Sequence, residues 1–295
     1  MKVLNFGSLN IDHVYQVHHF VRAGETIGSN GYARHMGGKG FNQSVALARA
    51  GAEVYHAGCI GEDGGFLQAY LREAGADTAF LRTVDGPTGH AIIQVEPSGE
   101  NCILLFGGAN QQVEEAQIRE VLSHFAAGDI LLLQNEISGL AALLKEGAGR
   151  GMRIAINPAP MDGAILAADL AGVRWLIVNE GEGAALSGMA DTQDILAALR
   201  KKYPHAAVVL TLGEKGAWYQ DEKETCFVEA FHAGNAVDTT GAGDTFTGYF
   251  LAGMAAGAPV RRSMEIAARA AGIAVTRPGA AQAIPALQEV DPAGF

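Results

Sequence analysis

The chain has 295 residues, 48% of them hydrophobic and 18% charged, which is the composition of a globular protein with a large core. Its formal net charge of −11, without a lysine- and arginine-rich block, argues against a nucleic-acid partner, because binding a phosphate backbone needs a basic surface. Three scattered cysteines without a CxxC pair exclude a disulfide framework or zinc site, and no apolar run reaches the roughly 18 residues of a membrane span, so we expect reduced thiols, a cytoplasmic location and no membrane partner.

The first element is the short apolar run from Val3 to Phe6, which is too short for a secretion signal and predicts a buried strand. Asn10 and Asp12 follow at its carboxyl end, where open α/β sheets bind ligands. Both residue types also suit turns, so a ligand role and a turn role both remain open. Residues 13–36 are irregular and glycine-rich with short alternating pieces, which predict strands.

A glycine-rich loop over residues 35–43 leads into a helix that Gly51 ends. Gly38 allows the backbone to touch a small ligand, and Asn42 in the first turn can hydrogen-bond hydroxyl groups. A solvated side chain is the alternative interpretation of Lys39. A strand over residues 53–60 and a helix over residues 66–73 are expected next.

Residues 88–106 alternate in polarity and turn at Pro97-Ser98-Gly99, which predicts a β-hairpin. His90 lies on its first strand. A structural role for this histidine is favoured over ligand contact.

From residue 118 onward, apolar strands alternate with helical segments, and four strands end in polar or glycine residues. These strands cover residues 130–134, 153–156, 175–178 and 208–212. The residues that follow them include Glu136, Asn157, Asn179 and Gly213. Each alone has a simpler interpretation as a solvated strand end. Together they predict that one edge of a parallel sheet is a ligand crevice.

The segment from Val237 to Phe246 passes from a loop with two glycines into an apolar-periodic helix. We expect this helix to begin between Gly241 and Asp244, with Thr239 or Thr240 as its cap.

The free N–H groups at the start of this helix predict an anion site. Asp244 is unusual there, because a carboxylate repels a bound anion. It is explained if Asp244 takes a proton while the amides hold developing negative charge. The alternative is an acidic first-turn residue that only favours the helix dipole.

Residues 264–275 predict an alanine-rich helix, and a turn follows. No linker, repeat or low-complexity stretch divides the chain. We therefore expect a single domain over residues 1–295.

Two motifs, Gly37–Gln43 and Asp238–Phe246, resemble the signatures of the ribokinase-like (PfkB) carbohydrate kinases, most closely its ribokinase members. Other patches match in the family's order and spacing between about residues 3 and 285. They are Asn10–Asp12, Gly107–Asn110, Asn157–Pro160, Asn179–Glu182 and Ala274–Arg277.

The resemblance implies an α/β fold in which helices flank a central, mostly parallel sheet, with a small β-sheet lid from residues 12–36 and 88–106. It implies transfer of phosphate from ATP, with Mg²⁺, to a sugar hydroxyl. Phosphoryl transfer needs in-line positioning, charge neutralisation and a place for the nucleophile's proton. A lid would exclude water, which otherwise competes with the sugar as the phosphate acceptor.

The resemblance also assigns roles to residues. The sugar would be held by Asn10, Asp12, Gly38, Lys39, Asn42 and Glu136. Asp244 would be the general base, and Gly241, Ala242 and Gly243 would supply anion-hole amides. The nucleotide side would comprise Asn179, Glu182, Thr211, Gly213 and Gly216, with Glu182 near Mg²⁺ through water.

A K⁺ ion is implied beside the anion hole. Its ligands would be Asp238 and Thr240 with carbonyls of Ala274, Arg277 and Gly279. Ala283 stands where ribokinase members have a polar side chain that helps to hold the ion, so weaker binding is expected.

Ribose is the leading substrate, and the alternatives are a nucleoside, deoxyribose, fructose or tagatose. The acidic chain argues against a phosphorylated sugar. A non-catalytic sugar sensor is disfavoured by the presence of Asp244. A dinucleotide-dependent oxidoreductase is disfavoured because Gly7-Ser8-Leu9-Asn10 stands where GxGxxG is expected. An exposed lid edge could pair two subunits as a homodimer.

Overall fold

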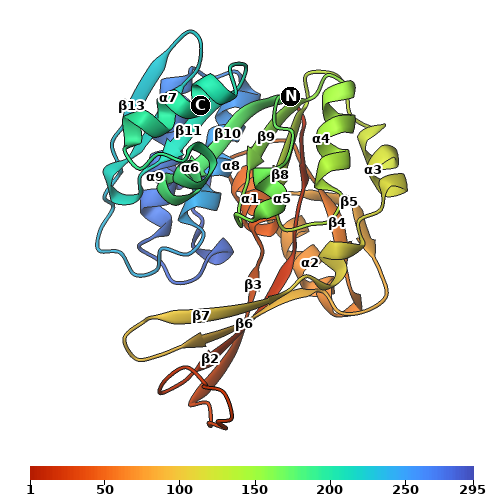
Figure 1. Cartoon of the computed structure of the whole chain (residues 1–295), viewed down its shortest axis with the longest axis vertical. Helices are drawn as coiled ribbons and strands as arrows, with labels where there is room; N and C mark the ends of the chain where they lie inside the picture. Colours follow the sequence, from red (N-terminus) through yellow and green to blue (C-terminus); the bar gives the residue numbers. More distant parts are fainter.

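The computed structural model describes all 295 residues and contains two separate sheets. The large sheet has nine strands in the order β13-β12-β11-β10-β9-β8-β1-β4-β5 (Figure 1). In that order they are Thr225–Val228, Ala217–Gln220, Ala207–Thr211, Val173–Asn179, Arg153–Asn157, Ile130–Gln134, Val3–Phe6, Val54–Ile60 and Asp77–Thr83. All neighbours from β11 to β5 pair in parallel, and only the β11–β12–β13 edge is antiparallel. The predicted central, mostly parallel sheet is therefore confirmed.

Helices cover both faces of this sheet. One face carries α1 (Lys39–Arg49), α2 (Gly65–Ala74), α8 (Ala242–Ala256), α9 (Val260–Ala274) and α10 (Leu287–Val290). The other carries α3 (Glu115–Leu122), α4 (Leu140–Gly149), α5 (Gly163–Leu166), α6 (Glu180–Ser187) and α7 (Thr192–Lys202). Short 3₁₀ turns lie at Glu62–Gly64, Gly108–Gln112, Gly213–Lys215 and Ala281–Ala283. No helix combines the length and apolarity needed to cross a bilayer.

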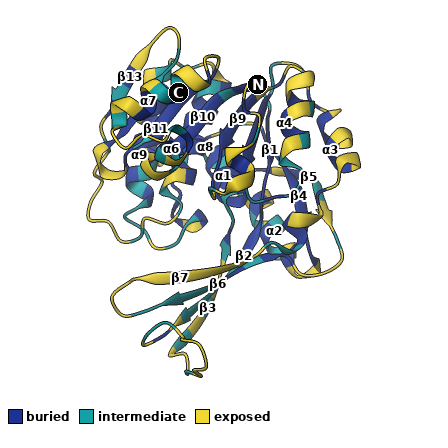
Figure 2. Ribbon diagram, viewed as in Figure 1, coloured by how far each residue is buried: buried dark blue, intermediate teal, exposed yellow.

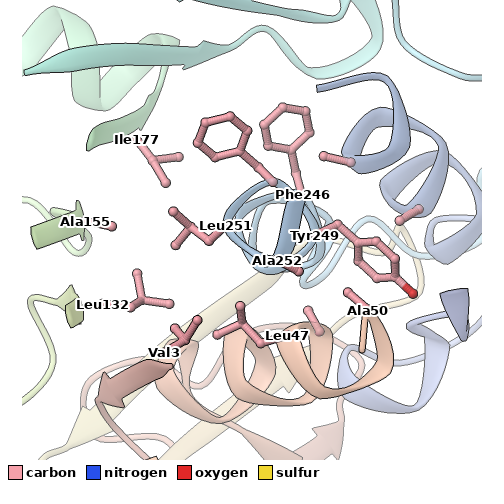
Figure 3. Packing of buried hydrophobic residues seen from close by; sticks show 14 of the residues in the cluster. Val3, Leu47, Ala50, Leu132, Ala155, Ile177, Phe246, Tyr249, Leu251 and Ala252 are labelled. Atoms are coloured by element: carbon pink, nitrogen blue, oxygen red, sulfur yellow. The ribbon is translucent and has the colours of Figure 1, made fainter. Parts of the chain in front are cut away.

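The core forms on both faces because side chains alternate along each strand. Val3 and Leu132 point to the α1 and α8 side, whereas Leu4 and Leu131 point to the α3 and α4 side. Figure 3 shows the first of these layers, in which α8 is seen end-on beside α1, and α8 packs against both α1 and α9. Its labelled side chains are Val3, Leu47, Ala50, Leu132, Ala155, Ile177, Phe246, Tyr249, Leu251 and Ala252. The same alternation decides which polar strand ends face α1 and α8.

The small sheet has the order β3-β2-β6-β7 and projects from one end of the body (Figure 1). It consists of β2 (Asn10–Gln16), β3 (Gly31–Gly37), β6 (Gly89–Val95) and β7 (Asn101–Phe106). The predicted hairpin over residues 88–106 is present as β6 and β7. Every residue of the edge strand β7 is exposed, as Figure 2 shows in yellow.

The structure refines two details of the sequence-based expectations. Of the two roles left open for Asn10 and Asp12, the turn role is wrong, because β2 begins at Asn10 and the two residues belong to the small sheet. The glycine-rich segment is also shorter than expected, since α1 already begins at Lys39. Lys39 and Asn42 are therefore held by helical backbone.

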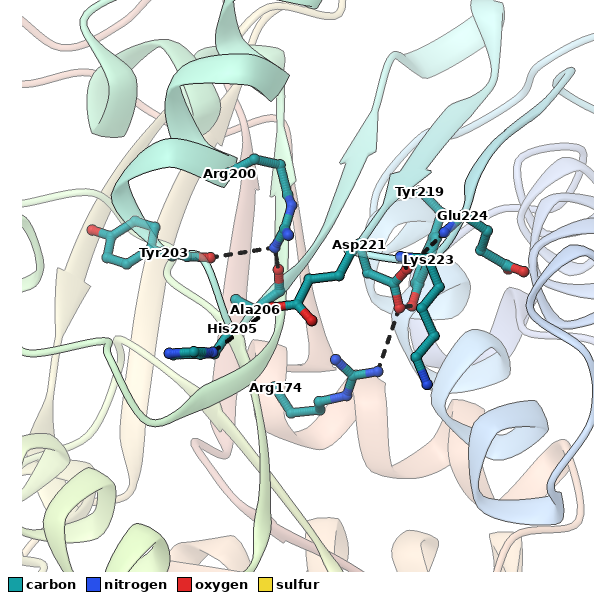
Figure 4. Close-up of polar contacts among 10 residues, drawn as sticks. Arg174, Arg200, Tyr203, His205, Ala206, Tyr219, Asp221, Lys223 and Glu224 are labelled. Carbon is teal, nitrogen blue, oxygen red and sulfur yellow. Dashed lines mark hydrogen bonds and ion pairs between the residues drawn. The ribbon is translucent and has the colours of Figure 1, made fainter.

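Polar contacts stabilise the antiparallel edge of the large sheet at the β12–β13 turn, far from the carboxyl ends of the parallel strands. Asp221, in the β12–β13 turn, accepts hydrogen bonds from the Tyr219 hydroxyl at 2.8 Å and the Lys223 backbone N–H at 2.8 Å (Figure 4). Arg174 of β10 forms an ion pair with the same carboxylate at 3.5 Å. This turn is a structural feature of the sheet edge.

Candidate active site

The carboxyl ends of the parallel strands meet at one edge of the large sheet. Gln134 at the end of β8 pairs in register with Asn157 at the end of β9, and Asn179 of β10 pairs with Thr211 of β11. Gln134 and Asn157 are buried on the side that α1 and α8 cover. The predicted coincidence of polar strand ends at one edge is therefore a feature of the structure.

The loop before α8 lies at this edge of the sheet and places backbone N–H groups there. Gly241, and neither Thr239 nor Thr240, is the N-cap of α8, without a side-chain cap hydrogen bond. Its φ of 75° lies in the left-handed region, where a side chain is strained. The Ala242 N–H already contacts the Thr239 carbonyl at 3.3 Å. Of the three expected anion-hole amides, that of Ala242 is thus partly occupied within the loop.

Asp244 in the first turn of α8 is 7% exposed and receives one side-chain amide on each oxygen. Asn42 Nδ2 donates to Oδ2 at 3.0 Å, and Gln43 Nε2 donates to Oδ1 at 2.8 Å. Asn42 Oδ1 is buried without a hydrogen-bond partner. An amide oxygen beside this carboxylate is therefore available to an incoming donor.

Asp12 and Glu136 form an acidic pair near the start of α1. Burial and the charge of Glu136 raise the pKa of Asp12 from 3.8 to about 7. Burial also raises the pKa of Glu136, although the Ser8 hydroxyl and the Lys39 backbone N–H, at 2.9 Å, donate to its Oε2. These carboxylates can accept hydrogen bonds from several hydroxyl groups.

Polar contacts also fix neighbouring residues that were expected to hold the sugar. Asn10 Oδ1 accepts from Asn110 Nδ2 at 2.8 Å, so the first strand of the small sheet is tied to the body. Gly38 is the N-cap of α1.

Lys39 is the cation in the middle of this acidic cluster. The carboxylate of Asp244 contributes most to raising the pKa of Lys39, and Glu136 and Glu182 add to the effect against the cost of burial. The lysine therefore stays protonated and partly neutralises the site.

Two adjacent cavities open at the start of α8. The first, called the inner cleft here, has a volume of about 190 Å³ and is lined by Lys39, Asn179, Glu182, Gly241, Gly243 and Asp244, among others. The second, called the outer cavity, has a volume of about 570 Å³, and Gly213, Gly216, Phe231, Asn235, Ala242 and Phe246 line it. Thr211 and Gly243 line both. The shape suits an elongated ligand whose phosphates reach Gly243.

Glu182 is held at the inner cleft by a capping box at the start of α6. Its backbone N–H donates to Asn179 Oδ1 at 2.8 Å, and its Oε2 accepts from the Asn179 N–H at 3.0 Å. Burial raises the pKa of Glu182. One carboxylate and one amide at a polar cleft fit Mg²⁺, which keeps several waters and takes few protein ligands.

The loop before α8 lies against the segment after α9. The backbone N–H groups of Val237 and Asp238 donate to the Val275 carbonyl at 2.7 and 3.2 Å, and Gly279 N–H donates to Asp238 Oδ2 at 3.0 Å. The Thr240 N–H donates to Asp238 Oδ1 at 2.9 Å. Asp238 and Thr240 are thus next to the segment that contains Ala274, Arg277 and Gly279. A carboxylate with nearby carbonyls is a donor set that fits a monovalent cation.

Comparison with known proteins agrees with this geometry. The family model for the pfkB family carbohydrate kinases matches residues 1–287. This chain belongs to that family. It is 36% identical over 293 residues to the ribokinase of Haemophilus influenzae, covering 96% of this chain and 95% of that protein.

Solved structures of ribokinases are similar over almost the whole kinase. The Cryptococcus neoformans ribokinase, solved with ADP, has a TM-score of 0.87 and 34% identity, covering 99% of each chain. The Arabidopsis thaliana ribokinase, solved with ribose and ATP, has a TM-score of 0.88 and 30% identity, covering 98% of this chain and 96% of that one. The chain is therefore a carbohydrate kinase of the ribokinase-like fold, as its motifs indicated.

Other residues of the kinase have roles that sequence reasoning missed or left open. His90 points away from Asp12, because the register places Ala91 beside Asp12, and it packs against Phe106 with a centroid distance of 5.0 Å. The structural interpretation of His90 is therefore favoured. Gln43 and Asn157 lie inside the motifs but were assigned no contact from the sequence.

Proposed function

We propose that this kinase transfers the γ-phosphate of ATP to a hydroxyl of an unphosphorylated pentose, with ribose the leading substrate. The observation that carries the proposal is the position of Asp244. Its carboxylate contacts Asn42 on the sugar side and shares the inner cleft with Lys39, Glu182 and Gly243. A group that can accept a proton thus lies between the sugar residues and the phosphate residues.

In the proposed reaction, Asp244 accepts the proton of the attacking hydroxyl as that oxygen approaches the γ-phosphate. Asn42 then hydrogen-bonds the sugar. The amides of Gly241, Ala242 and Gly243 hold the negative charge of the transferred group, and Lys39 adds a positive charge beside them. Phosphate transfer conserves charge and protons, because the hydroxyl proton moves to Asp244 while the phosphorus–oxygen bond to ADP breaks.

The outer cavity is the proposed nucleotide site, with Thr211, Gly213 and Gly216 along it. When bound, Mg²⁺ would neutralise phosphate charge. Glu182 and Asn179 would hold its water ligands. Asp238, Thr240 and the carbonyls of Ala274, Arg277 and Gly279 would hold K⁺ beside the anion-hole loop.

The sugar is proposed to bind between the small sheet and the body, contacted by Asn10, Asp12, Gly38, Lys39, Asn42 and Glu136. Two carboxylates in this set suit hydroxyl donors. They also repel a sugar phosphate, because Lys39 is the only cation of the set. The preference for an unphosphorylated sugar follows from this charge balance.

An ADP-release assay with ATP and a panel of acceptors tests the proposal. Ribose, deoxyribose, fructose, tagatose and nucleosides would be compared with fructose 6-phosphate at matched concentrations. We expect the highest kcat/KM with ribose. A higher value with fructose 6-phosphate would contradict the proposal, and no sugar-dependent ADP release with any acceptor would favour a sugar sensor.

We also propose that two copies of the kinase pair through the small sheet. The edge strand β7 exposes Ile103, Leu104, Leu105 and Phe106, with exposed fractions of 51–67%. A strand with one unpaired edge and apolar side chains on both faces is prone to association, and a second copy of the same chain can supply the matching edge. Pairing here would also cover the outer part of the lid.

A further inference from the structure

We infer that Gln43 is a positioning residue, which holds the carboxylate of Asp244 in one orientation while Asn42 is free to exchange between Asp244 and the sugar. This inference rests on the proposed function of Asp244 as the base. It concerns a residue that lies wholly beneath the site, since the Gln43 side chain is 0% exposed.

The close approach of two helices brings Gln43 to Asp244. Gly248, one turn after Asp244 on α8, packs against α1, and a Cβ at this position would lie 2.4 Å from Ala46 Cβ and 3.0 Å from the Gln43 carbonyl oxygen. Only glycine fits so close to a neighbouring backbone. The first turns of α1 and α8 are consequently near enough for direct side-chain contact.

The Gln43 side chain is also held on the side away from Asp244. Gln134 Nε2 donates to Gln43 Oε1 at 2.7 Å and to Asn5 Oδ1 at 2.9 Å. Asn5 Nδ2 donates to Ser44 Oγ at 2.8 Å, and Ser44 Oγ lies 2.7 Å from His56 Nδ1. The chain of contacts thus runs from the sheet interior to the base.

The groups at the two ends of this series of hydrogen bonds, Asp244 and His56, determine the donor and acceptor at each step. An ionised carboxylate only accepts, so Gln43 must turn its Nε2 toward Asp244 and its Oε1 toward Gln134. At the far end, burial lowers the pKa of His56 to about 4, so its ring is neutral and Nδ1 can accept from the Ser44 hydroxyl. Asn5 and Gln43 therefore each have a single satisfied orientation, and Gln134 is oriented by its Nε2, which donates to both of them, while its buried Oε1 has no partner.

The two amides on Asp244 differ in their freedom. Asn42 has a buried Oδ1 without a partner, so its amide can change partners when a sugar hydroxyl arrives. Gln43 has no such freedom, because its Oε1 is fixed by Gln134. Gln43 Nε2 also lies 3.3 Å from Asn157 Oδ1, and Asn157 Nδ2 lies 3.3 Å from Glu182 Oε2. Gln43 thus links the base to the carboxylate on the nucleotide side.

The test is Gln43→Met, which keeps an unbranched side chain of similar length and removes both polar contacts. We expect kcat to fall by about 10- to 100-fold, because small misplacement of a reacting group costs that much, while KM for sugar and ATP changes by less than about 3-fold. The matched control is Gln117→Met. Gln117 is also buried, and its Nε2 donates to the Gly58 carbonyl at 3.1 Å outside the site, so this variant should lose thermal stability and keep its kcat.

A merely structural role is separated by repeating Gln43→Met in an Asp244→Asn background. Once the base is removed there is no carboxylate to position, so we expect the additional loss of kcat to be under about 3-fold. An equal loss in both backgrounds, or Gln43→Met with parental kcat, would overturn the inference and leave the proposed function intact. Full turnover by Asp244→Asn alone would overturn both. If Gln43→Met does not fold, Gln134→Met removes the support behind Gln43 and should show the same dependence on Asp244.

Discussion

Asn42 and Asp244 are joined by a hydrogen bond of 3.0 Å although 202 positions separate them in the sequence. One residue lies in the first turn of α1 and the other in the first turn of α8. The contact unites the sugar-side and phosphate-side motifs in one site. It also makes Asp244 the first residue to test.

Asp244→Asn keeps the shape of the side chain and removes its basicity. Loss of a general base costs about 10²–10⁴-fold in rate, so we expect kcat to fall in that range with much smaller changes in sugar and ATP affinity. Steady-state kinetics and the melting midpoint check this together. A helix-start residue without a catalytic role would instead lose about 0.5–2 kcal/mol of stability and keep near-normal turnover.

Asp12 should make stability depend on pH. Its pKa is raised in the folded state to about 7 from 3.8, so its contribution is complete below pH 4 and is lost as the pH rises through 7. Asp12→Asn does not titrate. The free energy of unfolding of the variant minus that of the parent should therefore be larger at pH 8 than at pH 5, by up to about 3 kcal/mol. Denaturant titrations at both pH values measure this, and a constant difference would contradict it.

Activation by K⁺ is expected but weak. Ala283 is 3% exposed and apolar where a polar ligand is expected, so the proposed ion at Asp238 has one ligand fewer. Rates in potassium chloride should exceed rates in a bulky organic cation at equal ionic strength. Ala283→Ser should lower the half-saturating K⁺ concentration. Equal rates in both salts would remove the ion from the mechanism.

The proposed dimer is tested by Leu104→Lys. Leu104 is 67% exposed on β7, and a charge there would oppose pairing of two apolar strands. We expect the parent to behave as a dimer and this variant as a monomer in sedimentation. Met189→Lys, at a 44% exposed residue outside the small sheet, is the control that should leave the dimer unchanged. A monomeric parent would exclude this pairing.

Local patterns in the sequence were enough to predict the parallel strands, their polar ends and the start of α8. The turn role that the sequence left open for Asn10 and Asp12 is wrong, because turn-forming residue types also occur in strands when tertiary pairing, here with β3 and β6, supplies the hydrogen bonds. The expected threonine cap of α8 is wrong, because Gly241, with a left-handed φ of 75°, is the N-cap. The roles of Gln43 and Gln134 could not be predicted, since their contacts join residues 91 to 201 positions apart and no local pattern records such pairings.

Helix α8 also has a consequence for how the chain is made. Of its 15 residues 11 are buried, and it packs between α1 and α9 on one face of the sheet. During synthesis from the N-terminus, α1 is made about 200 residues before α8. The side of α1 that packs on α8 therefore stays exposed to solvent until α8 has been made. We expect a nascent-like fragment ending at residue 236 to bind a hydrophobic dye and a chaperone, whereas the full chain binds neither. A fragment that stays soluble and does not bind the dye would show that other parts of the chain cover α1 when α8 is absent.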